Sequence, residues 1–280
     1  TLFEISNFGG GTMIRPLFFE FPNEEDVYQG YEQTFMVGKC LKVSPVILPD
    51  SENQGKVNSY FPKDVRFISM NYLHEITTGE GKNITLDASW NYTNTHLREG
   101  SILPYQNTTA YPVSRTDYLL TDMGISLLIF TDTKGEAEGS LYIDEDGDNI
   151  HDFNVGNYQY YKLKYSENTL QINLLDGTGA NGPQDTGNQV LDEIVFLGME
   201  DKEHVNWAAC VYDSDLAPRK VEATYDEYIK GVRISASESD KLLFREILAI
   251  QLVDSDNDSS FCNPKYTVKK ISKSSISGDY

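Results

Sequence analysis

Short apolar segments separated by turns follow one another along most of this chain, and this pattern most constrains its fold. One series includes LKVSPVIL, VRFISM and GISLLIFT, and a second, after residue 157, includes YQYYKLKY, NTLQINLL and WAACVYDS. Strand-forming residues, among them 18 Tyr and 13 Phe, dominate these segments, and Gly, Asn and Asp separate them. The spacing predicts a mainly β protein with two antiparallel β-sandwich domains.

The first residues of the chain show a different pattern. Residues 12–21 form an apolar run that contains Arg15 and ends before Pro22, which predicts a strand buried on both sides. Arg15 in such a strand would need a carboxylate partner, because unpaired burial of its charge is costly.

A helical pattern follows this strand. Asn23 can cap a helix, and apolar residues recur every four positions after it. A single βα unit cannot bury both of its faces, so we expect the last βα unit of a (β/α)8 barrel, packed on βα repeats outside this sequence. The recurring residues are Val27, Tyr31 and Phe35.

These patterns divide the chain into four parts, with the second boundary in the Asp-rich stretch between the two strand series. The charged and polar tail is expected to be disordered. The parts are the barrel end at 1–40, a proximal β-sandwich at 41–150, a distal β-sandwich at 151–262 and the tail at 263–280.

Six motifs lie within residues 1–165, namely GGTMIRPLFFEFPNEEDVY, QTFMVGKCLKVSPVI, YFP, ITLDA, NTHLREGSILPYQ and GSLYIDEDGD. In this order and spacing they resemble the C-terminal part of glycoside hydrolase family 31, the α-glucosidases. The resemblance implies a retaining exo-hydrolase that releases glucose from maltose-like or glycogen-like oligosaccharides, without a cofactor. NTHLREGSILPYQ is most similar to the lysosomal and intestinal maltase branch.

The catalytic motifs of that family do not occur in the sequence. Glycoside hydrolysis needs two carboxylates about 5 to 9.5 Å apart, one as acid and one as nucleophile or base. The family carries them in Trp-x-Asp-Met-Asn-Glu and Gly-Asp-Asn segments on its barrel. Gly147, Asp148 and Asn149 spell the second motif but lie past the barrel's end, so no catalytic residue is assigned. The expected partner is the N-terminal, catalytic part of the same glucosidase.

Charge and sequons indicate the setting. Lys and Arg number 23 against 43 Asp and Glu, a net charge of −20 that repels phosphate backbones and argues against nucleic-acid binding. No apolar run is long enough to span a bilayer.

The sequence starts without an initiator Met and reads as an excised or processed segment. Sequons favour secretory passage, and with the resemblance they imply a lysosomal or secreted glycoprotein. They lie at Asn83, Asn91, Asn107 and Asn257.

An Asp-rich stretch, DEDGDNIHD, is the only candidate metal site. Its alternating carboxylates could wrap calcium, but the EF-hand template fails at Asn149 and Val155. Asp-Gly is a strong hairpin signal, so a turn without metal is the preferred interpretation. The candidate ligands are Asp144, Asp146, Asp148 and Asp152.

Three cysteines are too few for a disulfide framework. Cys210 and Cys262 both lie in the expected distal domain and are predicted to form a bridge. Cys40 lies in apolar GKCLKVSPV and is predicted to be a buried thiol.

The remaining motifs carry little chemistry. Gly177, Gly179 and Gly182 match a dinucleotide-binding spacing, but no helix follows them, so a loop is expected. The histidines are scattered without metal-ligand spacing, and packing is the expected role of the one in NTHLREG. They are His74, His96, His151 and His204.

Two other functions stay open. The chain could be a carbohydrate-binding module whose exposed aromatic residues stack on sugar rings. It could also be a calcium-dependent adhesion or assembly subunit built on the Asp-rich stretch. Core packing explains the aromatic candidates equally well; they are Trp90, Tyr158, Tyr160 and Tyr161.

Overall fold

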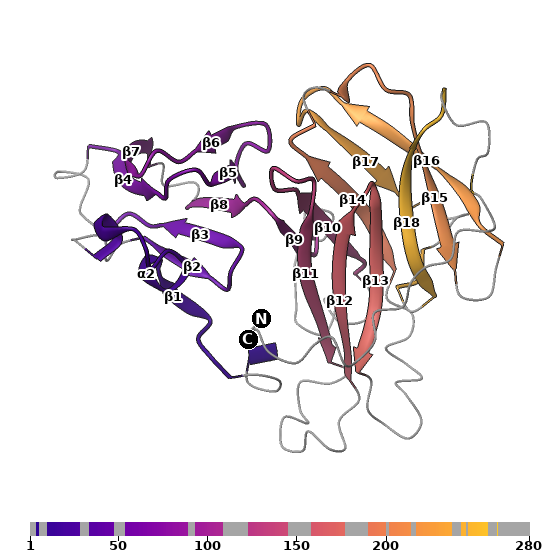
Figure 1. Cartoon of the computed structure of the whole chain (residues 1–280), viewed down its shortest axis with the longest axis horizontal. Coiled ribbons are helices and arrows are strands. Elements are labelled where there is room, and N and C mark those ends of the chain that lie inside the picture. The colour runs from indigo at the N-terminus through magenta and orange to yellow at the C-terminus, as the bar shows by residue number, and fades with distance from the viewer. Residues whose placement is uncertain are drawn as a thin grey trace. The chain divides into compact units, whose positions relative to one another are not determined.

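The computed structural model forms two compact units, Thr1–Ser101 and Ile102–Tyr280 (Figure 1). Strands dominate both, which confirms the prediction of a mainly β protein. None of the helices in the described part of the chain has the length and apolar character needed to cross a bilayer. The structure describes residues 4–5, 10–28, 34–47, 54–88, 93–108, 123–144, 158–176, 190–199, 202–213, 217–236, 242–244, 246–256 and 262.

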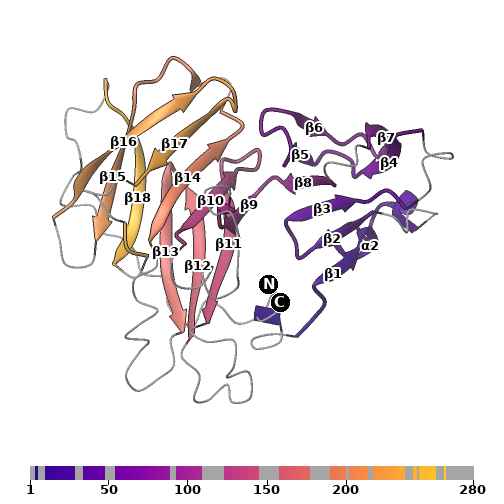
Figure 2. The same ribbon diagram turned by 180° about the vertical axis from the view of Figure 1, so that it is seen from behind.

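The first unit contains a six-stranded antiparallel sheet in the order β1-β2-β3-β8-β5-β6 and a two-stranded sheet of β4 and β7. Figure 2 shows β3 between β2 and β8. The elements are β1 (Ile14–Pro16), α2 (Leu17–Glu20), the 3-10 helix η2 (Glu25–Tyr28), β2 (Phe35–Val37), β3 (Leu41–Ser44), β4 (Lys56–Phe61), β5 (Arg66–Ser69), β6 (Ile76–Thr78), β7 (Lys82–Asp87) and β8 (Asn94–Arg98).

The two sheets of this unit share one core. Met36 on β2 and Phe67 on β5 belong to the same buried cluster as Tyr60 and Phe61 on β4, and Ile84 on β7 packs against it. Alternation along β4 explains the arrangement, since Lys56 and Asn58 are exposed whereas Val57 and Ser59 are buried.

The expected barrel end at residues 1–40 is wrong in its local structure. The strand is only β1, and a helical turn, α2, follows it directly. β1 pairs antiparallel with β2, which occupies the place of the last turn of the predicted helix. Four-residue apolar spacing predicted that helix, but β2 instead gains backbone hydrogen bonds from two neighbours, β1 and β3, and tertiary pairing overrides local propensity.

The second unit is a closed ten-stranded sheet in the order β10-β14-β17-β16-β15-β18-β13-β12-β11-β9. Its strands are β9 (Ser101–Tyr105), β10 (Ile125–Phe130), β11 (Ala137–Asp144), β12 (Tyr158–Ser166), β13 (Thr169–Asp176), β14 (Leu191–Leu197), β15 (Trp207–Asp213), β16 (Arg219–Asp226), β17 (Gly231–Ser235) and β18 (Ile247–Asp254).

The pairing of β10 with β14 departs from the predicted antiparallel arrangement, because these two strands run parallel. All six residues of β10, ISLLIF, are buried. A strand that is buried along its whole length, with Ser126 as its one polar residue, fits a parallel strand covered on both faces.

The boundary between the units lies at residues 101 and 102 and not near residue 150. β11 explains the difference, since it pairs with β12 along its whole length, from Ala137 to Asp144. Gly139 on β11 also approaches β9 closely, because a Cβ there would lie 2.2 Å from the Ile102 carbonyl oxygen. The Asp-rich stretch therefore connects two strands of one sheet. The predicted tail at 263–280 lies outside the described residues.

Candidate functional site

The most unusual group in the first unit is a fully buried lysine. Lys42 on β3 has an exposed fraction of 0%. Its Nζ donates hydrogen bonds to Ser44 Oγ at 3.2 Å and to Ser59 Oγ. It also lies 3.7 Å from the centre of the Phe61 ring, a cation–π contact when the amine is charged. Burial lowers the pKa of Lys42 to about 7, because the charged form loses its hydration.

His96 on β8 lies directly opposite Lys42 in the β3–β8 pairing. It is 5% exposed, and its ring stands perpendicular to Phe61 with 5.1 Å between ring centres. Its Nδ1 has no hydrogen-bond partner among the described residues. Burial, and then repulsion from Lys42, lower the pKa of His96 to about 3. The packing role expected for His96 matches this position, although the ring lacks one hydrogen bond.

These four polar side chains contain the groups of a Ser–Lys nucleophile and base pair. However, Lys42, Ser44 and Ser59 are each 0% exposed, so a substrate cannot reach them in this arrangement. Sequence reasoning missed Lys42, since it looked like one charged residue within an apolar strand. The only available signal was its place in LKVS, where the strand alternation puts Lys42 on the same face as Ser44.

A second charged cluster surrounds Glu20 at the end of α2. Glu20 accepts from Arg15 at 2.7 Å and from Arg98 at 3.2 Å, and its side chain is only 10% exposed. The Arg98 guanidinium also lies 4.7 Å from the centre of the Phe21 ring. Arg15 thus has the carboxylate partner that its place in an apolar run predicted.

The metal candidates are not brought together in the described part of the chain. Asp144 ends β11, but its side chain and the other three aspartates lie outside that part. Within the described residues, no group of three or more His, Cys, Asp or Glu could hold a metal ion. The glycine loop and His151 are likewise outside. His74 is half-buried, and His204 is exposed and contacts Glu203 at 3.3 Å.

The structure exposes two of the four sequons. Asn83 lies on β7 opposite Tyr60, and Asn107 follows β9; both are exposed. The hydroxyl of Thr85, the third residue of the first sequon, donates to Asn58 Oδ1 at 2.8 Å on the exposed face of the β4–β7 sheet. Asn91 and Asn257 lie outside the described residues.

We expect glycans on at least two of these four asparagines when the protein passes through a secretory pathway, because exposed sequons can be modified. Intact-mass measurement before and after endoglycosidase treatment checks this. Asn83→Gln and Asn107→Gln should each remove one glycan mass. An unchanged mass after treatment of the natural protein would contradict secretory passage.

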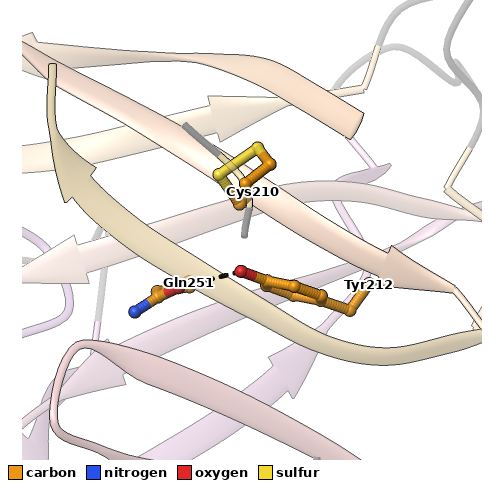
Figure 3. Close-up of a disulfide and its surroundings, with 4 residues drawn as sticks. Cys210, Tyr212 and Gln251 are labelled. Atoms are coloured by element: carbon orange, nitrogen blue, oxygen red, sulfur yellow. Dashed lines mark hydrogen bonds between the residues drawn. A yellow bond between two sulfur atoms is a disulfide. The ribbon is translucent and has the colours of Figure 1, made fainter. Parts of the chain in front are cut away.

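The disulfide is in the second unit. Cys210 on β15 is joined to Cys262, with 5.2 Å between their Cα atoms (Figure 3). Cys210 belongs to the same buried cluster as Tyr212, whose hydroxyl donates to Gln251 Oε1 at 3.1 Å. Cys40 is a free thiol. The whole residue is half-buried, less than predicted, although desolvation still raises the pKa of its thiol to about 11.

The aromatic candidates for sugar stacking are mostly in the core. Tyr160 and Tyr161 on β12 are 6% and 1% exposed. Tyr161 packs edge-on against Phe244 with 5.4 Å between ring centres. These two residues therefore offer no ring face to a sugar, which removes that argument for a carbohydrate-binding module. Trp90 and the side chain of Tyr158 lie outside the described residues.

Comparison with known families gives a match that coincides with the first unit. Residues 10–103 match the model of the glycosyl hydrolase family 31 C-terminal domain. The match includes most of residues 1–40, which were expected to end a catalytic barrel.

Several curated relatives share this region. An uncharacterized family 31 glucosidase of Schizosaccharomyces pombe is 32% identical over 203 residues, which is 71% of this chain and 18% of that protein. An α-glucosidase of Mucor javanicus is 34% identical over 63% of this chain and 20% of its own length. The lysosomal α-glucosidase of Mus musculus is 27% identical over 71% of this chain and 21% of its own length. The chain thus spans about a fifth of the curated relatives it matches.

Solved structures show the same fold over most of the chain. The glucosidase II α subunit with bound α3-Glc2 covers 88% of this chain with a TM-score of 0.69, at 18% sequence identity. A family 31 dextranase of Flavobacterium johnsoniae covers 87% with a TM-score of 0.59, at 17% identity. The aligned regions are 26% and 29% of those two chains.

Proposed function

The chain carries the C-terminal domain of glycosyl hydrolase family 31, and we propose that it forms the non-catalytic β part of a retaining, exo-acting α-glucosidase. The observation that supports this most is the family match over residues 10–103, together with α-glucosidase relatives. The substrates would be maltose-like or glycogen-like oligosaccharides with α-linked terminal glucose. No cofactor is needed for this reaction, since two carboxylates supply its acid and its nucleophile.

One pair of carboxylates in the second unit has the chemistry of a structural ion-pair cluster. Glu193 and Asp226 flank Arg233, which donates to them at 2.8 and 2.7 Å. Burial alone would raise the pKa of Asp226, but the hydrogen bonds from Arg233 and two backbone amides lower it. A glycosidase acid needs a raised pKa, so this arrangement is suited to joining β14, β16 and β17 and not to proton donation.

The N-terminal segment of the first unit supports a partner, the catalytic part of the same enzyme. Ile14, Phe19 and Tyr28 are 55%, 54% and 56% exposed. Phe18 contacts both Phe19 and Tyr28, with ring centres 5.1 and 5.3 Å apart. An exposed aromatic group of this kind marks a contact surface. The catalytic part would cover it in the complete enzyme, in a lysosomal or secreted setting.

Purified residues 1–280 alone are expected to show no turnover of a chromogenic α-glucoside, because the chain lacks the paired catalytic carboxylates. The complementary measurement uses an antibody against the chain to capture the natural protein from its source. The captured material should hydrolyse the α-glucoside and should contain, by mass spectrometry, a polypeptide with the two carboxylate motifs.

Two results would contradict the proposal. One is turnover by the pure chain that persists after further purification. The other is captured natural protein that lacks both α-glucosidase activity and the carboxylate motifs. A second capture, in which excess recombinant chain saturates the antibody, controls for unrelated glucosidases in the extract. Activity that remains in this capture does not come from the natural protein.

A further inference from the structure

Two basic side chains share one apolar core in the first unit. Lys42 and His96 are opposite each other on β3 and β8, and the Phe61 ring contacts both of them. Their exposed fractions are 0% and 5%, so neither can turn its polar end into water without opening the strand pair.

The surrounding strands provide hydroxyl and aromatic groups but no negative charge. Ser44 on β3 and Ser59 on β4 bind the Lys42 amine, and the Phe67 ring centre on β5 lies 5.9 Å from it. On β2, Met36 pairs with Lys42. Within the described residues, no carboxylate forms an ion pair with Lys42, and His96 is the only other titratable group of these five strands that acts electrostatically with it.

A core of this kind is stable only while its charge is low. Moving a charged group out of water is costly without a counter-charge, and two like charges in one site raise the cost further. Ser44 Oγ and Ser59 Oγ are also hydrogen-bonded to each other, at 2.6 Å. Each hydroxyl therefore keeps a hydrogen-bond partner when the Lys42 amine changes its charge.

The geometry points to an acid-sensitive lock in the first unit: we propose that the β3–β8 pair stays closed while His96 is uncharged, and that protonation of His96 beside Lys42 opens this strand pair. Lys42 is a positioning residue in this lock, because it makes the charge on His96 more costly. The inference does not depend on the proposed enzyme activity.

The direction of the pH dependence follows from linkage. The pKa of His96 is lowered from 6.5 to about 3 in the folded chain. Below pH 6.5, His96 therefore binds a proton in the opened state but stays uncharged in the closed state. The closed state becomes less stable relative to the opened state as the pH falls toward 3. Between pH 7.5 and 5, His96 alone should favour opening about 30-fold, whereas Lys42 adds about fourfold over the same interval.

The lock bears on the setting of the enzyme. The first unit would be closed near neutral pH and loosened in an acidic compartment. This favours a secreted setting over the lysosomal one.

Hydrogen exchange of the whole natural protein, read by mass spectrometry, tests the lock. The quantity is the protection factor of peptides covering β3 and β8, which corrects for the intrinsic pH dependence of amide exchange. In the unmodified protein it should fall at least 30-fold between pH 7.5 and 5. His96→Gln should remove about 30-fold of that fall. His74→Gln, at a half-buried histidine of the same unit, should leave it unchanged.

A second measurement needs no variant. Slow deuterium exchange at the Cε1–H of each histidine reports its titration in the unmodified protein. His96 should show no midpoint above pH 5. A His96 midpoint near 6.5, or equal pH dependence in the His96→Gln and His74→Gln proteins, would overturn the proposal.

Discussion

Removing the Cys210–Cys262 disulfide is expected to lower the free energy of unfolding of the second unit by about 4 kcal/mol. The bridge spans 52 residues of sequence. In the chain-entropy model it stabilises the fold because it restricts the unfolded chain, and the unfolded chain regains that conformational entropy when the bridge is lost. Cys210 is 0% exposed and belongs to a buried cluster with Ala208, Tyr212, Ala249 and Val253, against which Cys262 packs. The double variant Cys210→Ala/Cys262→Ala tests this.

Pulse proteolysis in urea, followed on peptides from β15 and β18, measures the change. Wild-type protein treated with a thiol reductant should have the same midpoint as the double variant, because both lack the bridge. Cys40→Ala provides the matched control; it removes a free thiol and should change stability by no more than about 1 kcal/mol. If the reduced protein keeps the full stability of the oxidised one, this bridge is not what stabilises the second unit.

Lys42→Met is expected to stabilise the first unit, by about 4 kcal/mol at pH 7 and about 2 kcal/mol at pH 9. The pKa of Lys42 is lowered from 10.5 to about 7 in the folded chain. The folded state therefore binds the Lys42 proton more weakly than the unfolded state does. The resulting destabilisation reaches its full size below pH 7 and disappears as the pH rises to 10.5. Methionine fills a similar volume without charge, and Ser44 and Ser59 remain hydrogen-bonded to each other.

The same substitution on the surface separates burial from charge. Lys56 on β4 has a side chain that is 54% exposed and pairs with Asp87. Lys56→Met should change stability by less than about 1 kcal/mol at both pH values. Urea unfolding of each variant at pH 7 and 9, read by hydrogen exchange of the β3, β4 and β8 amides, gives the comparison. A destabilised Lys42→Met protein at pH 7 would show that the hydrogen bonds and the ring contact of the amine outweigh its desolvation.

The local elements could be predicted wherever one strand carries its own pattern. LKVSPVIL and GISLLIFT were predicted as strands from strand-forming residues bounded by turns, and they contain β3 and β10. The six motifs in GGTMIRPLFFEFP to GSLYIDEDGD also carried the family resemblance, which the family match confirms.

Strand partners could not be predicted in the same way. Phe35 fitted a helix by spacing, yet it lies in β2, since β1 and β3 supply its strand with backbone partners on both sides. The domain boundary was misplaced because the turn signal at Asp-Gly identifies a connection but not the sheet that its two strands join. The parallel pairing of β10 with β14 joins strands far apart in sequence, which no local pattern specifies.

By itself, then, the sequence determined the strand-rich character of the protein, its family and its strongly negative charge, because these depend on composition and on motifs of neighbouring residues. Only the tertiary structure decided that Lys42 and His96 share one core and that Glu20 holds both Arg15 and Arg98. Each of these groups joins residues from separate strands or turns. The burial of these side chains, and the lowered pKa values of Lys42 and His96, therefore arise from distant segments that come together only when the chain folds.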